Sequence, residues 1–230
     1  MIQNYFITGT DTGVGKTHVT AALLAELRRR GLPAAGFKPI ACGADGRNDA
    51  RTYRKLMGNA VPLDIINPIY LRHPLAPSIA ARLEGRRIDL RQIAAFYYVL
   101  ASDFSPVLVE GAGGLLVPIK RNYFVADLAR QLDLPVIIVA RLGLGTLNHT
   151  LLTVRQAQAM KLRIAGVILN DTTGRRGLAE RTNLKAIAEL TGVPLLGVMP
   201  HGDRGKDSAV RAIVDRLRFF KESASPTMSR

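Results

Sequence analysis

A glycine-rich stretch near the N-terminus has the residue types and spacing of a nucleotide phosphate loop. It covers residues 9–17, Gly-Thr-Asp-Thr-Gly-Val-Gly-Lys-Thr. Backbone N–H groups in such a turn point toward an anion, and the start of the following helix adds partial positive charge. We expect Lys16 to reach the β- and γ-phosphates of the nucleotide and the Thr17 hydroxyl to ligate Mg²⁺. The loop is a variant, because Thr10 stands where the common pattern has glycine and Gly9 comes one residue too early.

A second lysine and two carboxylates follow at positions that could serve the same site. Glu110 ends an apolar run, and Asp49 follows the second predicted strand. Both are candidate ligands for Mg²⁺, which prefers oxygen. Lys38 ends that second strand and could stabilise charge that develops during phosphoryl transfer. Structural roles stay open: Glu110 could brace a loop, Asp49 could cap a helix, and Lys38 could be solvated.

A further glycine pair, at residues 143 and 145, precedes a long helical pattern. It could leave an open helix N-terminus that binds a carboxylate, or it could simply allow close packing. The four histidines are isolated and lack the spacing of metal ligands.

The elements that must position these residues alternate between strand and helix. Continuous apolar runs indicate strands that are covered on both faces. The alternation predicts a parallel sheet with helices on both faces, in which ligands bind at the carboxyl ends of the strands. The predicted strands cover residues 5–8, 34–37, 107–110, 135–140, 164–169 and 195–198, and the predicted helices cover 16–30, 49–57, 79–84, 90–101, 124–131, 147–160, 178–191 and 209–220.

The chain is expected to form one domain, a three-layer α/β fold of the P-loop NTPase type, over residues 1–221. Residues 40–46 are expected to form a loop, and residues 59–78, with four prolines, an irregular segment. Residues 222–230 are expected to be a disordered tail.

Composition narrows the classes of protein further. The 230 residues carry a net charge of +14, but the basic residues are scattered, so we expect no nucleic-acid partner. No apolar run is long enough to span a bilayer, and no secretory signal is apparent, so we expect no membrane association. The single cysteine, Cys42, excludes an internal disulfide. Together these features predict a cytoplasmic location.

The phosphate loop, with its displaced glycine, resembles that of the dethiobiotin synthetase family. The likeness continues along nearly the whole chain, in the family's order, at Phe37-Lys38-Pro39-Ile40, Asn67-Pro68, Pro77, Glu84-Gly85, Val109-Glu110-Gly111-Ala112-Gly113-Gly114, Gly143-Leu144-Gly145-Thr146-Leu147-Asn148-His149-Thr150 and Asn170-Asp171.

This resemblance implies a ligase of biotin biosynthesis that closes a cyclic urea with ATP and Mg²⁺. Its substrates would be 7,8-diaminononanoate (7,8-diaminopelargonate) and CO₂, and its product dethiobiotin. One amine takes up CO₂ as a carbamate, and the carbamate oxygen attacks the γ-phosphate of ATP. The second amine then attacks the carbon of the resulting carbamic–phosphoric anhydride and expels phosphate.

The resemblance also implies a role for each matching residue. Lys16 and Lys38 would be catalytic, and Thr17, Asp49 and Glu110 would hold Mg²⁺. Residues expected to contact ATP are Gly13, Val14, Gly15, Lys16, Thr17, His18, Asp49, Glu110, Gly111, Ala112, Gly113, Asn170, Asp171, Pro200, His201 and Gly202, with Asn170 reading the adenine edge. The diamine would contact Thr12, Lys38 and Cys42, and its carboxylate would be held by Leu144, Gly145, Thr146 and Asn148 of the other subunit.

The resemblance has two further implications, one for the assembly and one for Cys42. The sites would lie at the interface of a homodimer. Cys42 departs from the family, which usually carries a small hydroxyl residue there, and a thiol is a weaker hydrogen-bond donor.

One alternative is a dimeric switch ATPase of the partitioning or septum-positioning type. Those proteins also have variant phosphate loops, but with a signature lysine near the start, where this chain has Asp11. A nucleic-acid-binding NTPase would make use of the positive charge, but no basic segment supports it.

Overall fold

A six-stranded parallel sheet forms the centre of the molecule. The computed structural model describes residues 3–43 and 47–217. The strand order is β10-β9-β8-β1-β5-β2, and every neighbouring pair is parallel. The strands are β1 (Tyr5–Gly9), β2 (Ala35–Phe37), β5 (Val107–Gly114), β8 (Val136–Arg141), β9 (Ile164–Asn170) and β10 (Leu195–Met199). The predicted parallel sheet is therefore confirmed.

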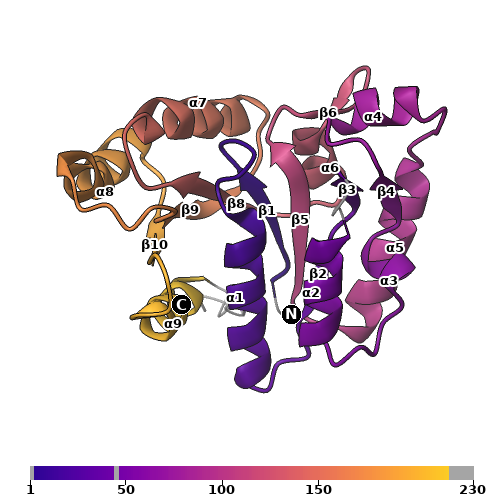
Figure 1. Ribbon diagram of the computed structural model, residues 1–230, viewed down its shortest axis with the longest axis horizontal. Coiled ribbons are helices and arrows are strands. Elements are labelled where there is room, and N and C mark those ends of the chain that lie inside the picture. The colour runs from indigo at the N-terminus through magenta and orange to yellow at the C-terminus, as the bar shows by residue number, and fades with distance from the viewer. Residues whose placement is uncertain (1–2, 44–46, 218–230) are drawn as a thin grey trace, which may run out of the picture.

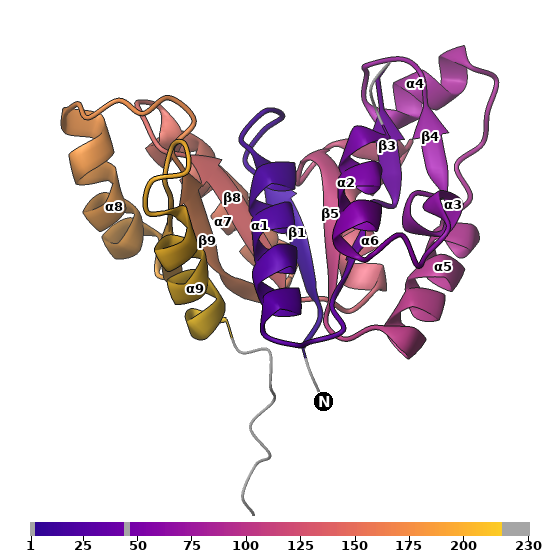
Figure 2. The same ribbon diagram turned by 60° about the horizontal axis from the view of Figure 1, so that its bottom comes forward.

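Helices cover both faces of this sheet, which gives the predicted three layers (Figures 1 and 2). On one face lie α1 (Lys16–Arg29), α2 (Asn48–Leu56) and α9 (Lys206–Arg216), and on the other lie α6 (Val125–Gln131) and α7 (Thr146–Ala159). The edges carry α8 (Leu178–Thr191) on one side and α3 (Leu63–Ile66), α4 (Pro77–Leu83) and α5 (Leu90–Asp103) on the other. Within the described residues, no helix is long and apolar enough to cross a membrane.

The core explains why the strands read as continuous apolar runs. Every residue of β1 is buried, and so are the first five residues of both β5 and β8. Phe6 in β1 and Ile137 in the neighbouring strand β8 both have no exposed surface. Because both faces are covered by helices, side chains of either orientation must be apolar.

Two segments that were expected to be loops contain short strands. Ile40–Cys42 forms β3, which pairs with β4 (Ile69–Leu71) in a separate two-stranded parallel sheet. The segment at 59–78 also contains α3 and the start of α4. The Asn67 side-chain amide ties these segments together, because it donates to the carbonyl oxygens of Lys38 at 2.8 Å and Ile69 at 3.0 Å.

Strand β5 continues past the point where the sequence suggested its end. It runs to Gly114, which pairs with Gly9, so Glu110 lies within the strand and not at its end. Glycine makes this possible, because a Cβ on Gly111 would lie 2.9 Å from the Phe6 ring and one on Gly114 would lie 3.4 Å from the Gly9 carbonyl oxygen. A hairpin follows that the sequence did not predict, formed by β6 (Pro118–Lys120) and β7 (Tyr123–Phe124).

The C-terminal helix begins earlier than expected. The prediction covered residues 209–220, whereas α9 begins at Lys206 and ends at Arg216. The tail at 222–230 and the domain boundary at 221 lie outside the described residues and remain predictions.

Candidate active site

The phosphate loop connects β1 to α1, and the side chain of Lys16 folds back toward Asp11 at the start of the loop. Gly15 is the N-cap of α1 and has a φ of 94°, a left-handed conformation that favours glycine. The Lys16 ammonium donates to the carbonyl oxygen of Asp11 at 3.0 Å. A Cβ on Gly9 would lie 3.0 Å from that ammonium nitrogen and 2.8 Å from Cγ2 of Val14. The displaced glycine of the sequence therefore leaves the space through which Lys16 passes.

Glu110 collects hydrogen bonds from three different elements. Its Oε1 accepts from Thr17 Oγ1 of α1 at 3.0 Å and from Lys38 Nζ at 2.5 Å, and its Oε2 accepts from the Tyr53 hydroxyl of α2. Lys38 Nζ also lies 2.8 Å from Asp49 Oδ2. Four predicted residues thus meet at one point, Thr17, Lys38, Asp49 and Glu110, and they form what we call the Glu110 cluster together with Tyr53.

Tyr53 is the member of this cluster that the sequence analysis missed. Its side chain has no exposed surface. A Cβ on Gly36 in β2 would lie 2.6 Å from the Tyr53 ring, so glycine at that position makes room for the tyrosine. One signal was available: Tyr53 stands four residues after Asp49 in a predicted helix, so the two side chains share a face.

Burial and charge separate the two lysines of the site. Burial lowers the pKa of Lys16 to about 8. The negative charge of Glu110 opposes this shift, whereas the positive charge of the nearby Lys38 adds to it. Burial also opposes the charged form of Lys38, but the carboxylates of Glu110 and Asp49 outweigh it and raise the pKa of that lysine. Lys38 is therefore held as a cation, and an anion at the loop would favour the charged form of Lys16.

The oxygen donors of the Glu110 cluster suit a hard divalent cation. Two carboxylates, Glu110 and Asp49, lie against the Lys38 ammonium, and the charge of Lys16 also interacts with both of them. Asp49 Oδ2 is 2.8 Å from Lys38, while its side chain is one-third exposed and presents a second oxygen. Mg²⁺ commonly binds one or two carboxylates and completes its shell with water and phosphate. The described residues contain no group of three or more His, Cys, Asp or Glu side chains that could hold a metal without such help.

The ends of β9 and β10 bring together the residues that were expected to form the base pocket. Asn170 Nδ2 donates to the carbonyl oxygen of Val14 at 2.9 Å, which fixes the end of β9 to the phosphate loop. The Asp171 backbone N–H donates to the Met199 carbonyl oxygen at 2.9 Å. A Cβ on Gly174 would lie 3.0 Å from the His201 ring. Asn170, Asp171 and the segment after β10, with Pro200, His201 and Gly202, are therefore neighbours.

The Asp171 carboxylate is occupied within its own loop. It accepts from the backbone N–H groups of Thr173 and Gly174 and from Arg176, the last at 2.6 Å. Burial alone would raise the pKa of this carboxyl, but those donors hold it below its ordinary value. Asp171 thus braces the loop beside the expected base pocket.

His18, in the first turn of α1, lines a hollow of about 790 Å³ between α1, α2 and α9. Burial, followed by the positive charge of Lys206, lowers the pKa of the imidazole, so His18 is neutral at neutral pH.

Of the expected diamine contacts, Thr12 lies in the phosphate loop and Cys42 ends β3. Thr12 is exposed, and its Oγ1 would be 3.4 Å from a Cβ on Gly113. Cys42 is half-buried at the end of β3, and this burial raises the pKa of its thiol to about 11. The positive charge of Lys38 opposes the shift, and the negative charge of Glu84 adds to it.

The residues at the start of α7 are divided between surface and interior. Leu144, Gly145 and Asn148 are exposed, whereas Thr146 is buried with its Oγ1 3.3 Å from Thr150 Oγ1. No hydrogen bond or ion pair among the described residues joins them to the Glu110 cluster. Within a single chain, they are therefore not part of that cluster.

Comparisons with known proteins identify the family of this chain. A family model described as an AAA domain matches residues 3–206. An ATP-dependent dethiobiotin synthetase BioD of Bacillus licheniformis is 40% identical over 202 residues, 86% of each chain. A protein of the same name from Anaeromyxobacter dehalogenans (strain 2CP-C) is 45% identical over 201 residues, 86% of this chain and 90% of that one.

Solved structures show the breadth of the fold. The MinD cell division protein of Aquifex aeolicus superimposes with a TM-score of 0.60 at 15% identity, covering 97% of this chain and 100% of that one. Identity this low shows the shared fold alone. The sequence relatives are far more similar to this chain than these structures are. They show that the chain belongs to the dethiobiotin synthetase family.

Proposed function

We propose that this protein is an ATP-dependent dethiobiotin synthetase, a ligase that closes a cyclic urea on 7,8-diaminononanoate with CO₂. The observation that carries the proposal is the position of Lys38. Its ammonium is buried between Glu110 and Asp49, and Glu110 in turn joins it to Thr17 of the phosphate loop. A fixed cation beside a phosphate loop suits a reaction in which negative charge moves between a carbamate and a phosphate.

The proposed reaction has three steps. One amine of the diamine adds to CO₂ and loses a proton, which gives a carbamate. A carbamate oxygen attacks the γ-phosphorus of ATP, ADP leaves, and a carbamic–phosphoric anhydride forms. The second amine attacks the carbamoyl carbon, loses a proton and expels phosphate, which leaves the ring of dethiobiotin.

The protein's part in these steps is positioning and charge stabilisation. Lys16 contacts the transferred phosphoryl group, and Lys38 contacts the carbamate oxygen as it attacks. Thr12 and Cys42 line the diamine, and residues 13–18 and 110–113 surround the ATP phosphates. Asn170, Asp171 and residues 200–202 hold the base.

Mg²⁺ would be held by Thr17, Asp49 and Glu110. It would neutralise the phosphate oxygens of ATP and fix their orientation. The meeting of the Thr17 hydroxyl with the Glu110 carboxylate, and of both carboxylates at Lys38, supports this assignment because Mg²⁺ prefers oxygen ligands.

We also propose a homodimer, in which the start of α7 from one subunit holds the diamine carboxylate at the site of the other. Leu144 is 90% exposed in the single chain, which is unusual for a large apolar side chain. A cytoplasmic location follows from the proposed use of ATP in biosynthesis. The switch-ATPase alternative has only the shared fold in its favour.

The direct test is to mix the protein with ATP, Mg²⁺, bicarbonate and the diamine and to look for the cyclic urea by mass. Omission of any one component should abolish the product. The Lys38→Met variant should be at least about a hundredfold slower, the scale of losing one preorganised charge contact. Lys55→Met, which removes an exposed lysine from α2, is the matched control and should keep full activity. ATP turnover that ignores the diamine would contradict the proposal.

A further inference from the structure

A second hollow, of about 360 Å³, lies away from the phosphate loop between α4, the segment at 84–89 and β6. Figure 1 shows α4 and β6 close together at one end of the molecule. Buried apolar side chains, including Ile88 and Ile119, line part of it. The rest of its lining is Ser78, Ala81 and five basic residues, Arg82, Arg86, Arg87, Lys120 and Arg121. We call this hollow the α4–β6 pocket.

These five cations are not neutralised by the protein. No acidic residue lines the pocket. Arg86 donates to the carbonyl oxygen of Tyr70. Among the described residues, the other four side chains have no hydrogen bond or ion pair.

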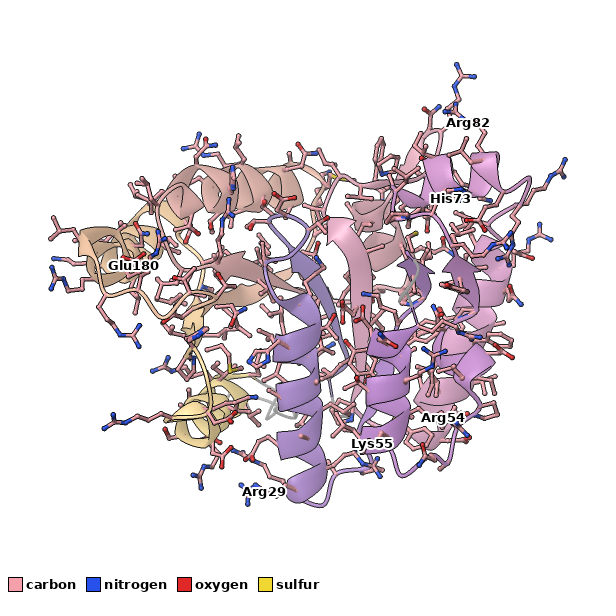
Figure 3. All side chains as sticks on the ribbon, in the orientation of Figure 1. Arg29, Arg54, Lys55, His73, Arg82 and Glu180 are labelled. Carbon is pink, nitrogen blue, oxygen red and sulfur yellow. The ribbon has the colours of Figure 1, made fainter. Side chains whose placement is uncertain are left out.

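Basic residues elsewhere in the molecule are often paired. Arg29 lies 2.7 Å from Glu26, Arg163 lies 2.9 Å from Asp133, and Arg176 lies 2.6 Å from Asp171. Arg54 and Lys55, both on α2, lie at the opposite end of the molecule from Arg82 of the pocket (Figure 3). The α4–β6 pocket differs in that five basic side chains line one hollow, and within the described part of the chain none of the five is in an ion pair.

We propose that the α4–β6 pocket binds a compact anion with at least two negative charges, of the diphosphate class. Like charges held in one hollow repel each other, and a polyanion would relieve that repulsion. The guanidinium groups offer the paired donors that suit phosphate oxygens. The pocket volume falls in the range of small-molecule sites. A nucleic acid would need charge along an extended face, whereas these charges converge on one hollow.

This site is separate from the proposed active site. None of its lining residues belongs to the phosphate loop, the Glu110 cluster or the expected base pocket. The pocket substitutions alone, made in a protein that keeps Lys16, should therefore leave synthetase activity unchanged while the second anion is lost.

The test is equilibrium dialysis with pyrophosphate at 150 mM salt, where distant surface charges are screened. Because the phosphate loop also binds phosphates, every variant carries Lys16→Ala. The pocket variant adds Arg87→Ser, Lys120→Ser and Arg121→Ser. The matched control adds Lys55→Ser, Arg91→Ser and Arg181→Ser, which removes the same charge from exposed, unpaired side chains on α2, α5 and α8.

We expect the pocket variant to bind pyrophosphate at least about tenfold more weakly than its Lys16→Ala parent, since charge-assisted bonds are lost. The control should stay within threefold. Binding by the pocket variant within threefold of the parent would overturn the proposal, and so would an equal loss in the control, which would indicate general attraction to a basic protein. Thermal melting checks that each variant is folded. Failure of the proposed active site would be seen separately, as unchanged ATP binding by Lys16→Ala.

Discussion

Glu110 holds the proposed site together because it is a buried carboxylate with donors on both oxygens. Its side chain is 1% exposed, and it accepts from Thr17, Lys38 and Tyr53. A buried polar group with a missing partner is costly, so each donor helps to hold the carboxylate in place.

Tyr53→Phe should lower the free energy of unfolding by about 2 kcal/mol, because a buried, charged acceptor loses its donor while the ring stays. The change should also raise the Mg²⁺ concentration needed for half-maximal activity, since Oε2 of Glu110 is no longer fixed. Urea denaturation and a Mg²⁺ titration of cyclic urea formation measure the two effects.

Tyr97→Phe is the matched control for that substitution. Tyr97 is also buried, but its hydroxyl accepts from the neutral amide of Asn4 at 3.0 Å. We expect a loss below about 1 kcal/mol and no change in the Mg²⁺ requirement. Equal losses for the two variants would mean that the charge of Glu110 is irrelevant to the bond.

The sequence pointed to Thr17, Lys38 and Glu110 because Thr17 belongs to the phosphate loop and the other two stand at or near the end of a predicted strand. Their meeting at one point follows from the parallel sheet. Tyr53 could not be assigned in this way. Its place depends on the close approach of α2 to Gly36 in β2, and no local pattern encodes that approach.

The phosphate loop and the end of β9 are packed together too tightly for a side chain at Gly15. A Cβ there would lie 2.0 Å from Asn170 Nδ2, whereas a Cβ on Gly13 would have no atom within 4 Å. Both glycines have a positive φ, 94° and 74° respectively. Substitutions at the two positions therefore separate the effect of a steric clash with Asn170 from the effect of a strained backbone.

Gly15→Ala should abolish ATP binding and lower the melting temperature, because the loop must move away from Asn170. Gly13→Ala should keep measurable ATP binding and cost about 1 kcal/mol for the strained backbone alone. Calorimetric titration with an ATP analogue and thermal melting test both variants. Equal behaviour of the two variants would contradict the packing role assigned to Asn170.

The end of α1 is fastened by Glu26, which lies 2.7 Å from both Arg29 and Arg30. Arg30 also lies 2.7 Å from Asp215, so this group joins α1 to α9. The hydrogen bond from Arg29 lowers the pKa of Glu26 from 4.5 to about 2. Arg30 adds to this shift, and burial opposes it. Because the folded-state pKa is below the unfolded value, Glu26 stabilises the fold above pH 4.5, and that stabilisation is lost as the pH falls toward 2.

Glu26→Gln should therefore cost about 1–2 kcal/mol at pH 6.5, allowing for solvent screening, and less at pH 3.5. Urea denaturation at both values measures the difference. Glu189→Gln is the control, because that exposed carboxylate lies 3.7 Å from Lys185 and should change stability by less than about 0.5 kcal/mol. A cost for Glu26→Gln that is independent of pH would contradict the role of its charge.

The long elements were predictable because their apolar pattern is sustained. Strands β8 and β9 have six and seven residues, and α7 and α8 have fourteen each. The missed strands β3, β4, β6 and β7 have three residues or fewer, too short to establish a period. They form through tertiary contacts, of which the Asn67 amide is one example.

The proposed dimer makes a prediction about the whole assembly. Leu144, two residues before α7, and Leu152, within α7, are 90% and 61% exposed. Leu144→Asp with Leu152→Asp should convert the dimer into a monomer and abolish cyclic urea formation, because each site would lose the residues of the other subunit. Sedimentation and the mass assay measure the two losses.

The control for the dimer places the same change on a different helix. Leu178 and Leu190 belong to α8 and are 73% and 57% exposed. Leu178→Asp with Leu190→Asp should leave both assembly and activity intact. An active monomer from the α7 variant would show that each chain is complete by itself.

The hydrogen bond between Asn170 and the phosphate loop has a consequence for the choice of base. One N–H of its amide nitrogen is committed to the carbonyl oxygen of Val14, which fixes the orientation of the amide and so the direction in which Oδ1 points. An acceptor in a fixed direction can pair with the exocyclic amino group of adenine or cytosine, but it would face the O6 oxygen of guanine, or the O4 oxygen of uracil, as one acceptor faces another. In the proposed base pocket, the bond that closes the loop thereby also favours a base with an amino group at that position over a base with an oxygen there.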